Sequence, residues 1–318
     1  MDQLDRQLLH ALYLDGRASF SRIAAVLGVS GPTVARRYRV LRQSGAARVV
    51  GSVQAAGVGR SVWVLRLTCA PGAAPEIAAA LARRPDTHWV RIASGGTEVL
   101  CNVHADEADR DALLLDKLPA TRSVTAIHAC CLLHTFTDGG ADWAPLSSAL
   151  SPDQVEALTY RPSAVPGAHA PDEPDRVLFS ELARDGRTPA GELARATGRD
   201  ESTVRRRIAS LRADGILAFD LDVDLRALGC GTAALLWIKV QPKRLAAAGA
   251  ALADHPEVAF VAATTGPTSL LASVVTTDES ALYGYLTRRL GAVRGVRDVR
   301  TTPILRTVKR SGARLPSR

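Results

Sequence analysis

The sequence predicts an α+β protein: a winged-type helix-turn-helix followed by a ferredoxin-like βαββαβ domain, with this pair occurring twice in tandem. Three observations support the prediction. The chain repeats itself after a shift of 170 positions, which places Gly45 over Gly215. In each copy, apolar residues first recur at helical spacing. Further along, they form short strand-like runs separated by two helical stretches.

The two helix-turn-helix segments align without a gap, because residues 4–45 lie over residues 174–215. We call residues that are 170 positions apart in these segments counterparts. Identical counterparts include Asp15 and Asp185, Gly16 and Gly186, Arg17 and Arg187, Gly28 and Gly198, Arg36 and Arg206, Arg37 and Arg207, and Arg42 and Arg212. Beyond these segments the repeat continues more weakly, with the small offsets expected for loops.

The repeat divides the chain into six predicted segments. The stretch between the halves is rich in Pro, Gly and Ser, which indicates a linker, and one short helix is expected after Ser151. The segments are a helix-turn-helix domain at 1–55, a ferredoxin-like domain at 60–138, the linker at 139–171, a second helix-turn-helix domain at 172–225, a second ferredoxin-like domain at 230–309 and a basic tail at 310–318.

The first copy begins with three predicted helices. Leucines at i, i+4 and i+8 starting from Leu4 indicate an amphipathic helix, which ends before Gly16. Ser19 is placed to cap a second helix, and Gly28 forms a tight turn after it. Ser30 is placed to cap a third helix. Three short helices with a tight turn before the last are typical of a helix-turn-helix unit.

In the second copy the third helix carries three consecutive arginines. Its apolar residues Val204, Ile208 and Leu211 form the inner face, so the arginines must fan over the exposed side near the helix N-terminus. Such a helix fits the DNA major groove, and its N-terminal residues reach base edges. The candidate DNA-contacting residues are Gly31, Thr33, Arg36, Arg37, Glu201, Ser202, Arg205, Arg206 and Arg207.

Two of these arginines have a second interpretation. Arg37 and Arg207 lie closer to the buried stripe, so a structural ion pair is as well supported as a phosphate contact. Arg39 and Arg42 are expected to be solvated. The charge around the two helices also differs, because residues 1–50 hold eight arginines against three aspartates, a net charge of +5, whereas acidic residues surround the second arginine cluster. The two copies therefore need not read the same half-site.

Composition excludes several classes of protein. The chain of 318 residues has a net charge of +8, is 47% hydrophobic and 23% charged, and is therefore globular rather than disordered. No apolar run is long enough to cross a bilayer, and no secretory signal is visible, so a cytoplasmic location is expected. Five cysteines without a C-x-x-C pair predict reduced, buried thiols. The scattered histidines give no metal-binding pattern, so neither a metal nor a cofactor is expected.

Each half continues in the order strand, helix, strand, strand, helix, strand. The expected strands are 61–69, 88–94, 97–105 and 123–136 in the first half and 232–240, 258–265, 269–277 and 296–308 in the second, with helices at 74–84, 107–118, 244–255 and 279–291. Helices cover one face of each sheet, and the other face must pair to be stable in water. We therefore expect self-association through these sheets, within or between chains.

The ordered motifs D-G-R, G-V-S and T-V-x-R-R-x-x-x-L-x-x-x-G, joined to a βαββαβ domain, resemble the Lrp/AsnC family of transcription regulators. The resemblance covers both halves and implies a regulator that binds double-stranded DNA. Members usually carry one such pair per chain and dimerise through the sheets, so this chain resembles a fused dimer. The resemblance also implies a small, amino-acid-like effector near Gly95 and Glu98 and near Gly266 and Ser269. An Asp typical of the family is missing from both loops, and a plain turn is an equally good interpretation.

One enzymatic alternative shares this architecture. Siroheme decarboxylases include fused two-copy chains, and such an activity would need groups such as His88 and Arg91 in the ferredoxin-like domain. The corresponding stretch of the second copy has neither, and the aromatic-rich strand of those enzymes is absent. We therefore expect a DNA-binding regulator rather than an enzyme.

Overall fold

The computed structural model describes residues 1–54, 60–104, 106–137, 144–147, 149–161 and 171–310. The chain forms two compact units, and each unit combines segments from both halves of the sequence. The first, here called the HTH unit, comprises Met1–Arg60 and Leu146–Leu228. The second, here called the barrel unit, comprises Ser61–Pro145 and Gly229–Arg310. The two predicted helix-turn-helix segments therefore pack together in one unit, and the two predicted ferredoxin-like segments pack together in the other.

The first copy of the HTH unit contains the three predicted helices α1 (Gln3–Leu14), α2 (Phe20–Leu27) and α3 (Gly31–Gln43). Ser19 and Ser30 cap α2 and α3, as the sequence predicts, by accepting hydrogen bonds from backbone N–H groups in the first turn. Gly28 ends α2 with a φ of 67°, a left-handed conformation that favours glycine. The helix-turn-helix prediction is therefore confirmed in its local detail.

The second copy repeats this construction with α8 (Glu173–Arg184), α9 (Ala190–Thr197) and α10 (Glu201–Ala213). Gly198 again has a φ of 67°, and Asp200 caps α10 by accepting from the Thr203 N–H. The N-terminus of α9 differs, because Pro189 stands at the capping position and supplies no side-chain hydrogen bond.

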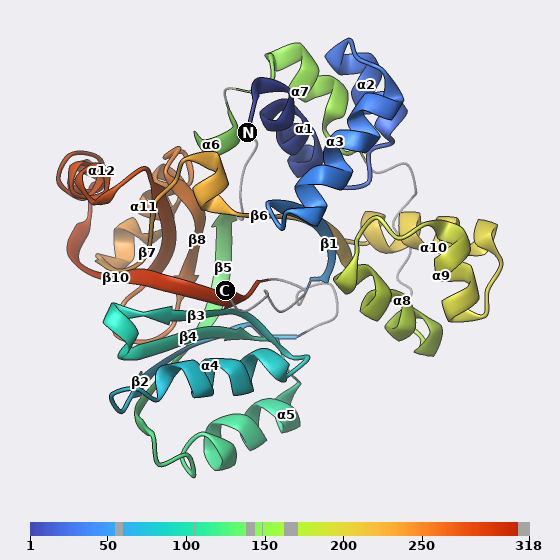
Figure 1. Ribbon diagram of the computed structural model, residues 1–318. Helices are drawn as coiled ribbons and strands as arrows, with labels where there is room; N and C mark the ends of the chain where they lie inside the picture. The colour runs from blue at the N-terminus through green and yellow to red at the C-terminus, as the bar shows by residue number, and fades with distance from the viewer. Residues whose placement is uncertain (55–59, 105, 138–143, 148, 162–170, 311–318) are drawn as a thin grey trace. The chain divides into compact units, whose positions relative to one another are not determined.

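A strand follows each third helix, and the two strands pair with each other. β1 (Ala47–Val53) and β6 (Leu217–Val223) run antiparallel, with Val50 opposite its counterpart Asp220 (Figure 1). Since the register is centred on counterparts, the two helix-turn-helix copies are related by an approximate two-fold axis through this ribbon. One chain thus contains the kind of pair that two subunits form in a symmetric dimer.

The linker supplies one further helix to the HTH unit. α7 (Pro152–Leu158) is capped by Ser151 as predicted, and it packs on α1 and α2. Gln154 Nε2 donates to the carbonyl of Val26 at 3.1 Å, and Leu158 is fully buried. The predicted tail from 311 onward, the end of the first predicted domain at 55 and the linker positions 139–143, 148 and 162–170 lie outside the described residues. Short helices α6 (Ala144–Ser147) and η4 (Leu225–Leu228) complete the connections.

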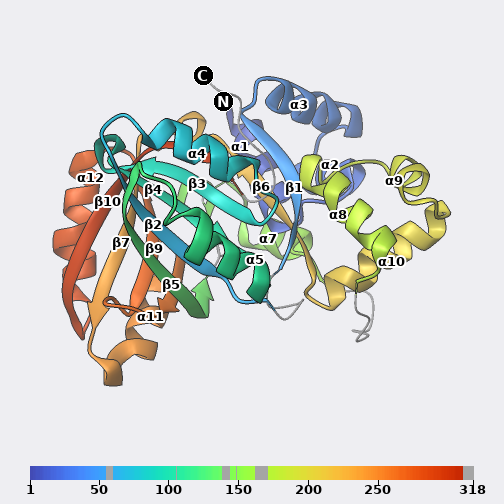
Figure 2. The same cartoon turned by 90° about the horizontal axis from the view of Figure 1, so that it is seen from below.

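The barrel unit confirms the two ferredoxin-like domains. Its strands are β2 (Trp63–Cys69), β3 (Thr87–Ala93), β4 (Glu98–Val103), β5 (Val124–Thr137), β7 (Thr232–Val240), β8 (Val258–Thr264), β9 (Leu270–Thr276) and β10 (Val296–Lys309). They form one closed barrel in the order β10-β3-β4-β2-β5-β8-β9-β7 (Figure 2). The long strands β5 and β10 join the two four-stranded sheets, β5 by pairing with β8 and β10 by pairing with β3.

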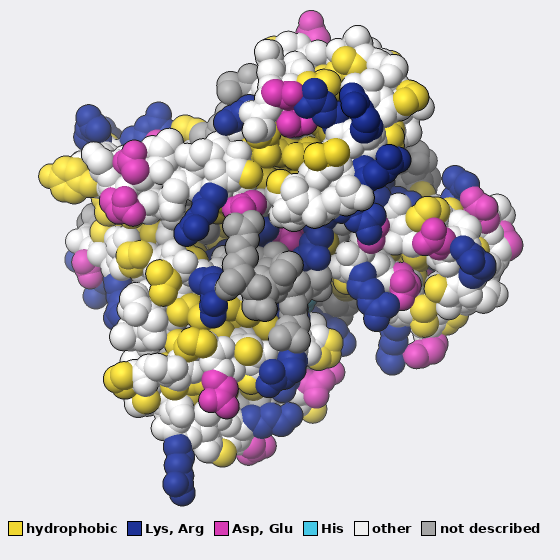
Figure 3. Space-filling model, viewed as in Figure 1, with side chains coloured by type: hydrophobic (Ala, Val, Ile, Leu, Met, Phe, Trp, Pro, Cys, Tyr) yellow, Lys and Arg dark blue, Asp and Glu magenta, His cyan; other side chains and the backbone are white. Residues whose placement is uncertain are grey.

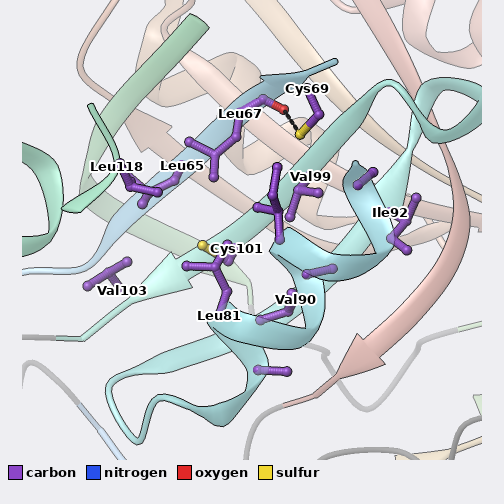
Figure 4. Packing of buried hydrophobic residues seen from close by; sticks show 14 of the residues in the cluster. Leu65, Leu67, Cys69, Leu81, Val90, Ile92, Val99, Cys101, Val103 and Leu118 are labelled. Carbon is purple, nitrogen blue, oxygen red and sulfur yellow. Dashed lines mark hydrogen bonds between the residues drawn. The ribbon is translucent and has the colours of Figure 1, made fainter. Parts of the chain in front are cut away.

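Helices cover the outside of the barrel. They are α4 (Ala74–Arg83), α5 (Glu107–Asp111) with the π-helical η3 (Ala112–Lys117), η5 (Pro242–Arg244) with α11 (Leu245–Ala253), and α12 (Glu279–Gly284) with the π-helical η6 (Tyr285–Arg289) and η7 (Leu290–Ala292). In the first sheet, Leu65, Val99 and Cys101 pack against Leu81 of α4 (Figure 4). An equivalent cluster lies between the second sheet and its helices.

The other faces of the two sheets meet inside the barrel. Val64 and Leu100 of the first sheet pack there with Leu235, Trp237 and Leu271 of the second. The predicted association of sheets therefore occurs within one chain. All five cysteines are free of disulfides and four of them are buried, as predicted. Within the described ranges no helix has both the length and the apolar character needed to cross a membrane.

Candidate nucleic-acid interface

The helices α3 and α10 present the same scaffold in the two copies. Each has 13 residues, and each buries three apolar side chains at matching positions. These are Val34, Tyr38 and Leu41 in α3 and Val204, Ile208 and Leu211 in α10. Because one face is fixed in the core, the opposite face and the first turn are available to a partner.

In the first copy the only charged side chains exposed on α3 are basic. Arg36 and Arg39 are exposed, as the sequence predicts for a solvated or DNA-facing position. Thr33 lies in the first turn, where its Oγ1 is 2.8 Å from the hydroxyl of Ser30. Gly31 adds no side chain, and a Cβ placed there would meet nothing within 4 Å.

In the second copy the exposed face of α10 mixes charges. Arg205 and Arg206 are exposed, and Arg205 forms an ion pair with Glu201 one turn earlier. Ser202 Oγ donates to Asp200 at 2.7 Å. Hydrogen bonds from Thr203 and then Ser202 lower the pKa of Asp200, so this capping carboxylate is ionised at neutral pH. Acidic and basic side chains accordingly intermingle over α8–α10 in Figure 3.

Arg37 and Arg207 do not join this exposed set. Arg207 donates to Asp175 from Nε at 3.1 Å and from Nη2 at 2.5 Å. Arg37 donates to Asp5, the counterpart of Asp175, at 3.0 Å, and also to the carboxylate of Asp2. Both arginines therefore tie the third helix to the start of the first helix. Of the two interpretations open from the sequence, the geometry favours the structural ion pair over a phosphate contact.

A set of contacts across the two copies was missed by the sequence reasoning. Arg17 donates to the carbonyl of Gly186 at 2.8 Å, and Arg187 donates to the carbonyl of Gly16 at 2.6 Å. Burial, with the neighbouring charges of Arg187 and Arg212, lowers the pKa of Arg17 to about 10. The sequence did contain a signal for these contacts, because all four residues are identical counterparts in the repeat.

Two ion pairs between the copies are related in the same reciprocal way. Arg212 donates to Asp15 at 2.9 Å, and Arg42 lies 2.8 Å from Asp185. Arg42, expected to be solvated, is thus half exposed but engaged with the other copy. Arg212 is the more enclosed of the two, with its guanidinium 3.4 Å from the ring centre of Tyr160 in the linker. These contacts hold α3 and α10 in a fixed pair.

The predicted effector residues of the first copy lie at a tightly bonded turn. Gly95 is left-handed with a φ of 67°, and Glu98 is only 4% exposed. Glu98 accepts from Ser94 Oγ at 2.7 Å and from Arg300 Nη2 at 2.8 Å. Arg66 Nε lies 3.9 Å from the same carboxylate. The charge of Glu98 is therefore balanced by arginines from both halves of the chain.

The second copy has no carboxylate at this place. Gly266 is exposed with a φ of 100°. The Ser269 hydroxyl accepts from the backbone N–H of Val240 at 3.0 Å, so it is engaged by its own sheet. The two predicted effector loops thus differ in charge.

The residues weighed for the enzymatic alternative lie on β3. The guanidinium of Arg91 lies 4.7 Å from the ring centre of Trp89, and burial lowers the pKa of Arg91 to about 10. The rings of His88 and His104 stack with centres 4.3 Å apart. Among the described residues, no group of His, Cys, Asp or Glu could hold a metal ion.

Comparisons with known proteins agree with these observations. The AsnC-type helix-turn-helix domain matches residues 1–42 and residues 172–212, and the Lrp/AsnC ligand binding domain matches residues 233–314. The HTH-type transcriptional regulator FL11 of Pyrococcus horikoshii is 32% identical over 139 residues, covering 43% of this chain and 91% of that protein. The regulator LrpA of Pyrococcus abyssi is 25% identical over 139 residues, covering 43% and 99%.

A likeness over the whole chain is found among solved structures. The siroheme decarboxylase NirDL, crystallised with an iron-uroporphyrin III analogue, superposes with a TM-score of 0.63 at 11% identity. The superposition covers 98% of this chain and 94% of that chain. At this identity the likeness concerns the fold, in which tandem modules are arranged in one polypeptide.

Proposed function

The chain belongs to the Lrp/AsnC family, and we propose that it is a sequence-specific regulator of transcription that binds double-stranded DNA. In this proposal α3 and α10, the two helices that contact the DNA, belong to the same polypeptide. The observation that carries the proposal is the pair of capped helices α3 and α10, each with exposed arginines, held together by reciprocal contacts between the copies.

The chemistry of this surface suits DNA. Each helix enters a major groove, where Arg36 and Arg206 at matching positions donate bidentately to guanine O6 and N7. Arg39 and the backbone N–H groups of the first helical turns contact phosphates, which fixes the register on the duplex. Because arginines supply much of the attraction, affinity falls steeply as salt concentration rises.

The test is a comparison of two charge-matched double variants. Arg36→Ala with Arg206→Ala removes one arginine from each recognition helix, and Arg288→Ala with Arg297→Ala removes two exposed arginines from the barrel unit. A bidentate arginine–guanine contact contributes about 1–3 kcal/mol of discrimination, so the loss of two such contacts lowers the operator affinity of the first variant by about thirtyfold or more, whereas the control stays close to wild type. The operator itself comes from genome-wide mapping of bound DNA, and full binding by the first variant would refute the proposal.

We also propose that the barrel unit binds a small-molecule effector, supported by the match of its second copy, at residues 233–314, to the Lrp/AsnC ligand binding domain. The loop holding Gly95 and Glu98 is the better of the two candidates, since only it carries a carboxylate. A panel of amino acids, tested for a rise in thermal midpoint, checks this, because a ligand that binds only the folded state stabilises it. No rise with any member at millimolar concentration contradicts an amino-acid effector.

That the protein is a regulator and not an enzyme is likewise our proposal. The alternative, a siroheme decarboxylase-like activity, draws support from Arg91, which lies over the Trp89 ring, from the stacked rings of His88 and His104, and from the full-length likeness in fold. Incubation with siroheme, followed by analysis of the porphyrin carboxylates, decides between the two. Loss of carboxylate groups that depends on Arg91 would overturn the non-enzymatic proposal.

A further inference from the structure

We infer that the DNA site of this protein is an asymmetric pair of inverted half-sites, which share the base pairs read by Thr33/Thr203 and Arg36/Arg206 and differ at the positions faced by Gly31/Glu201 and Ala35/Arg205. The inference rests on the proposed function. The two recognition helices share a common scaffold, so their exposed side chains correspond position by position.

The two helices share their capping positions and their buried faces. α3 and α10 begin one residue after equivalent caps, Ser30 and Asp200, and bury the same three positions. The ribbon between β1 and β6 pairs Val50 with Asp220, so the approximate two-fold axis relates each helix to the other. Counterparts on the two helices therefore meet equivalent positions of two inverted half-sites.

Two outward positions are identical in the copies. Thr33 and Thr203 occupy the first turn, and Arg36 and Arg206 follow one turn later. Both arginines are exposed, and Arg206 lies close enough to its threonine for Nη2 to donate to Oγ1 at 3.3 Å. The same side chains in the same places read the same base pair, so the half-sites share a core at which an arginine favours guanine.

Two further outward positions carry charged side chains in α10 and uncharged ones in α3. Where α10 has Glu201 and Arg205, α3 has Gly31 and Ala35, which carry no polar group. Both charged side chains are well exposed, at 49% for Glu201 and 68% for Arg205. A carboxylate near a base edge accepts from the cytosine amino group, and an arginine donates to guanine. Only the half-site under α10 is read by these groups.

At a third outward position the charged side chain belongs to α3, and α10 has none. α3 carries Arg39, which is exposed, whereas its counterpart in α10 is Ala209. The first copy therefore places its second exposed arginine about one turn further from the helix N-terminus than the second copy, which uses Arg205. The anionic Asp200 and Glu201 also oppose phosphate at the start of α10, where α3 has the neutral Ser30.

The experiment selects binding sites from random double-stranded DNA with the full-length protein and two exchange variants. Glu201→Gly with Arg205→Ala gives α10 the side chains of α3 at these two positions, and Gly31→Glu with Ala35→Arg makes the reverse exchange at the same positions. Position 31 accepts a side chain, since a Cβ there meets nothing within 4 Å. Circular dichroism confirms folding of each variant, and either exchange alone is sufficient for the test.

We expect the wild-type protein to select two unlike half-sites with a common core. Its affinity for this site should exceed that for either symmetrised inverted repeat by about tenfold or more, as expected when at least one base pair per site is mismatched. Each exchange variant should instead favour a symmetrised repeat, a different one in each case. The exchange also identifies which half-site belongs to which helix.

Two outcomes overturn the inference while leaving the proposed function intact. One is selection of a perfect inverted repeat by the wild-type protein, and the other is an unchanged preference in a folded exchange variant. A third outcome, no enrichment of any sequence by the wild-type protein at low salt, overturns the proposed function and the inference with it.

Discussion

Replacement of Asp175 by Ala tests whether Arg207 is a structural residue rather than a DNA contact. The Asp175 side chain is fully buried and accepts hydrogen bonds from Arg207 and from Arg199 Nη1, the latter at 3.2 Å. Removing it leaves two guanidinium groups, only 15% and 21% exposed, without their buried partner. Breaking a buried pair in this way costs about 3–5 kcal/mol.

The first copy supplies the matched control. Asp5, the counterpart of Asp175, is 15% exposed and pairs with an arginine, Arg37, that is 32% exposed. Its removal also breaks a capping box at the same helix position, so the two variants lose the same local hydrogen bonds. Because the first pair is better solvated and lacks a counterpart of Arg199, Asp5→Ala should cost about 1 kcal/mol.

The assay separates the two units of the protein. The described tryptophans Trp63, Trp89 and Trp237 all lie in the barrel unit, so their fluorescence follows that unit while the helical circular dichroism follows both units. In urea, Asp175→Ala should lower the midpoint of the helical transition and leave the fluorescence transition in place. A destabilisation no larger than that of Asp5→Ala would show that burial of this pair contributes nothing.

The stability lost in Asp175→Ala should depend on pH in a direction set by the pKa of Asp175. Burial alone raises the pKa of Asp175, but the hydrogen bonds from Arg207 and the Asp172 cap outweigh it and hold the pKa below the ordinary value of 3.8. The stabilisation is therefore present above pH 3.8 and is lost as the pH falls through the folded pKa. The difference between wild type and Asp175→Ala should shrink in strong acid.

Three further outcomes are expected. Gly186→Ala should cost about 1–3 kcal/mol, because its Cβ would lie 2.8 Å from Val49 Cγ1, whereas Gly31→Ala should leave urea unfolding unchanged. Burial raises the pKa of Cys101 to about 12, so the native thiol should resist a disulfide reagent at pH 8, and stability should fall as unfolded thiols ionise above about pH 9. Glu98→Gln should lower the thermal midpoint, since it removes the charge that balances two arginines; an unchanged midpoint would refute this.

Much of the fold was predictable because its signals are local. Capping residues such as Ser30 and Asp200, glycines such as Gly28, and alternating apolar strands specify their elements within a few residues of sequence. The repeat then added a constraint that a single copy would lack. It predicted the three helices of each helix-turn-helix copy and the βαββαβ elements of each ferredoxin-like domain twice, and the structure contains both sets, whereas the strands β1 and β6 were not predicted as separate elements.

The site was harder to predict because its residues act over long separations. Sequence periodicity places Arg37 beside the buried stripe but cannot reveal the carboxylate of Asp5 on another helix. The contact of Arg17 with Gly186 depends on how two modules associate, and no helical or strand pattern encodes it. Identity between the copies was the available sign that these residues share a role, and it does not distinguish a contact between modules from a contact with DNA.

The interleaving of the two units has a consequence for how the chain folds during synthesis. β1 ends at Val53, but its partner β6 begins at Leu217. The two-stranded β1–β6 sheet therefore cannot form until most of the chain has left the ribosome. The barrel closes later still, because β3 pairs with β10, the last strand of the barrel to be synthesised. The growing chain thus displays unpaired strand edges and an open apolar sheet face for much of its synthesis, the features that favour aggregation and slow folding. A nascent chain of this design depends on chaperones more than a chain whose domains are contiguous in sequence.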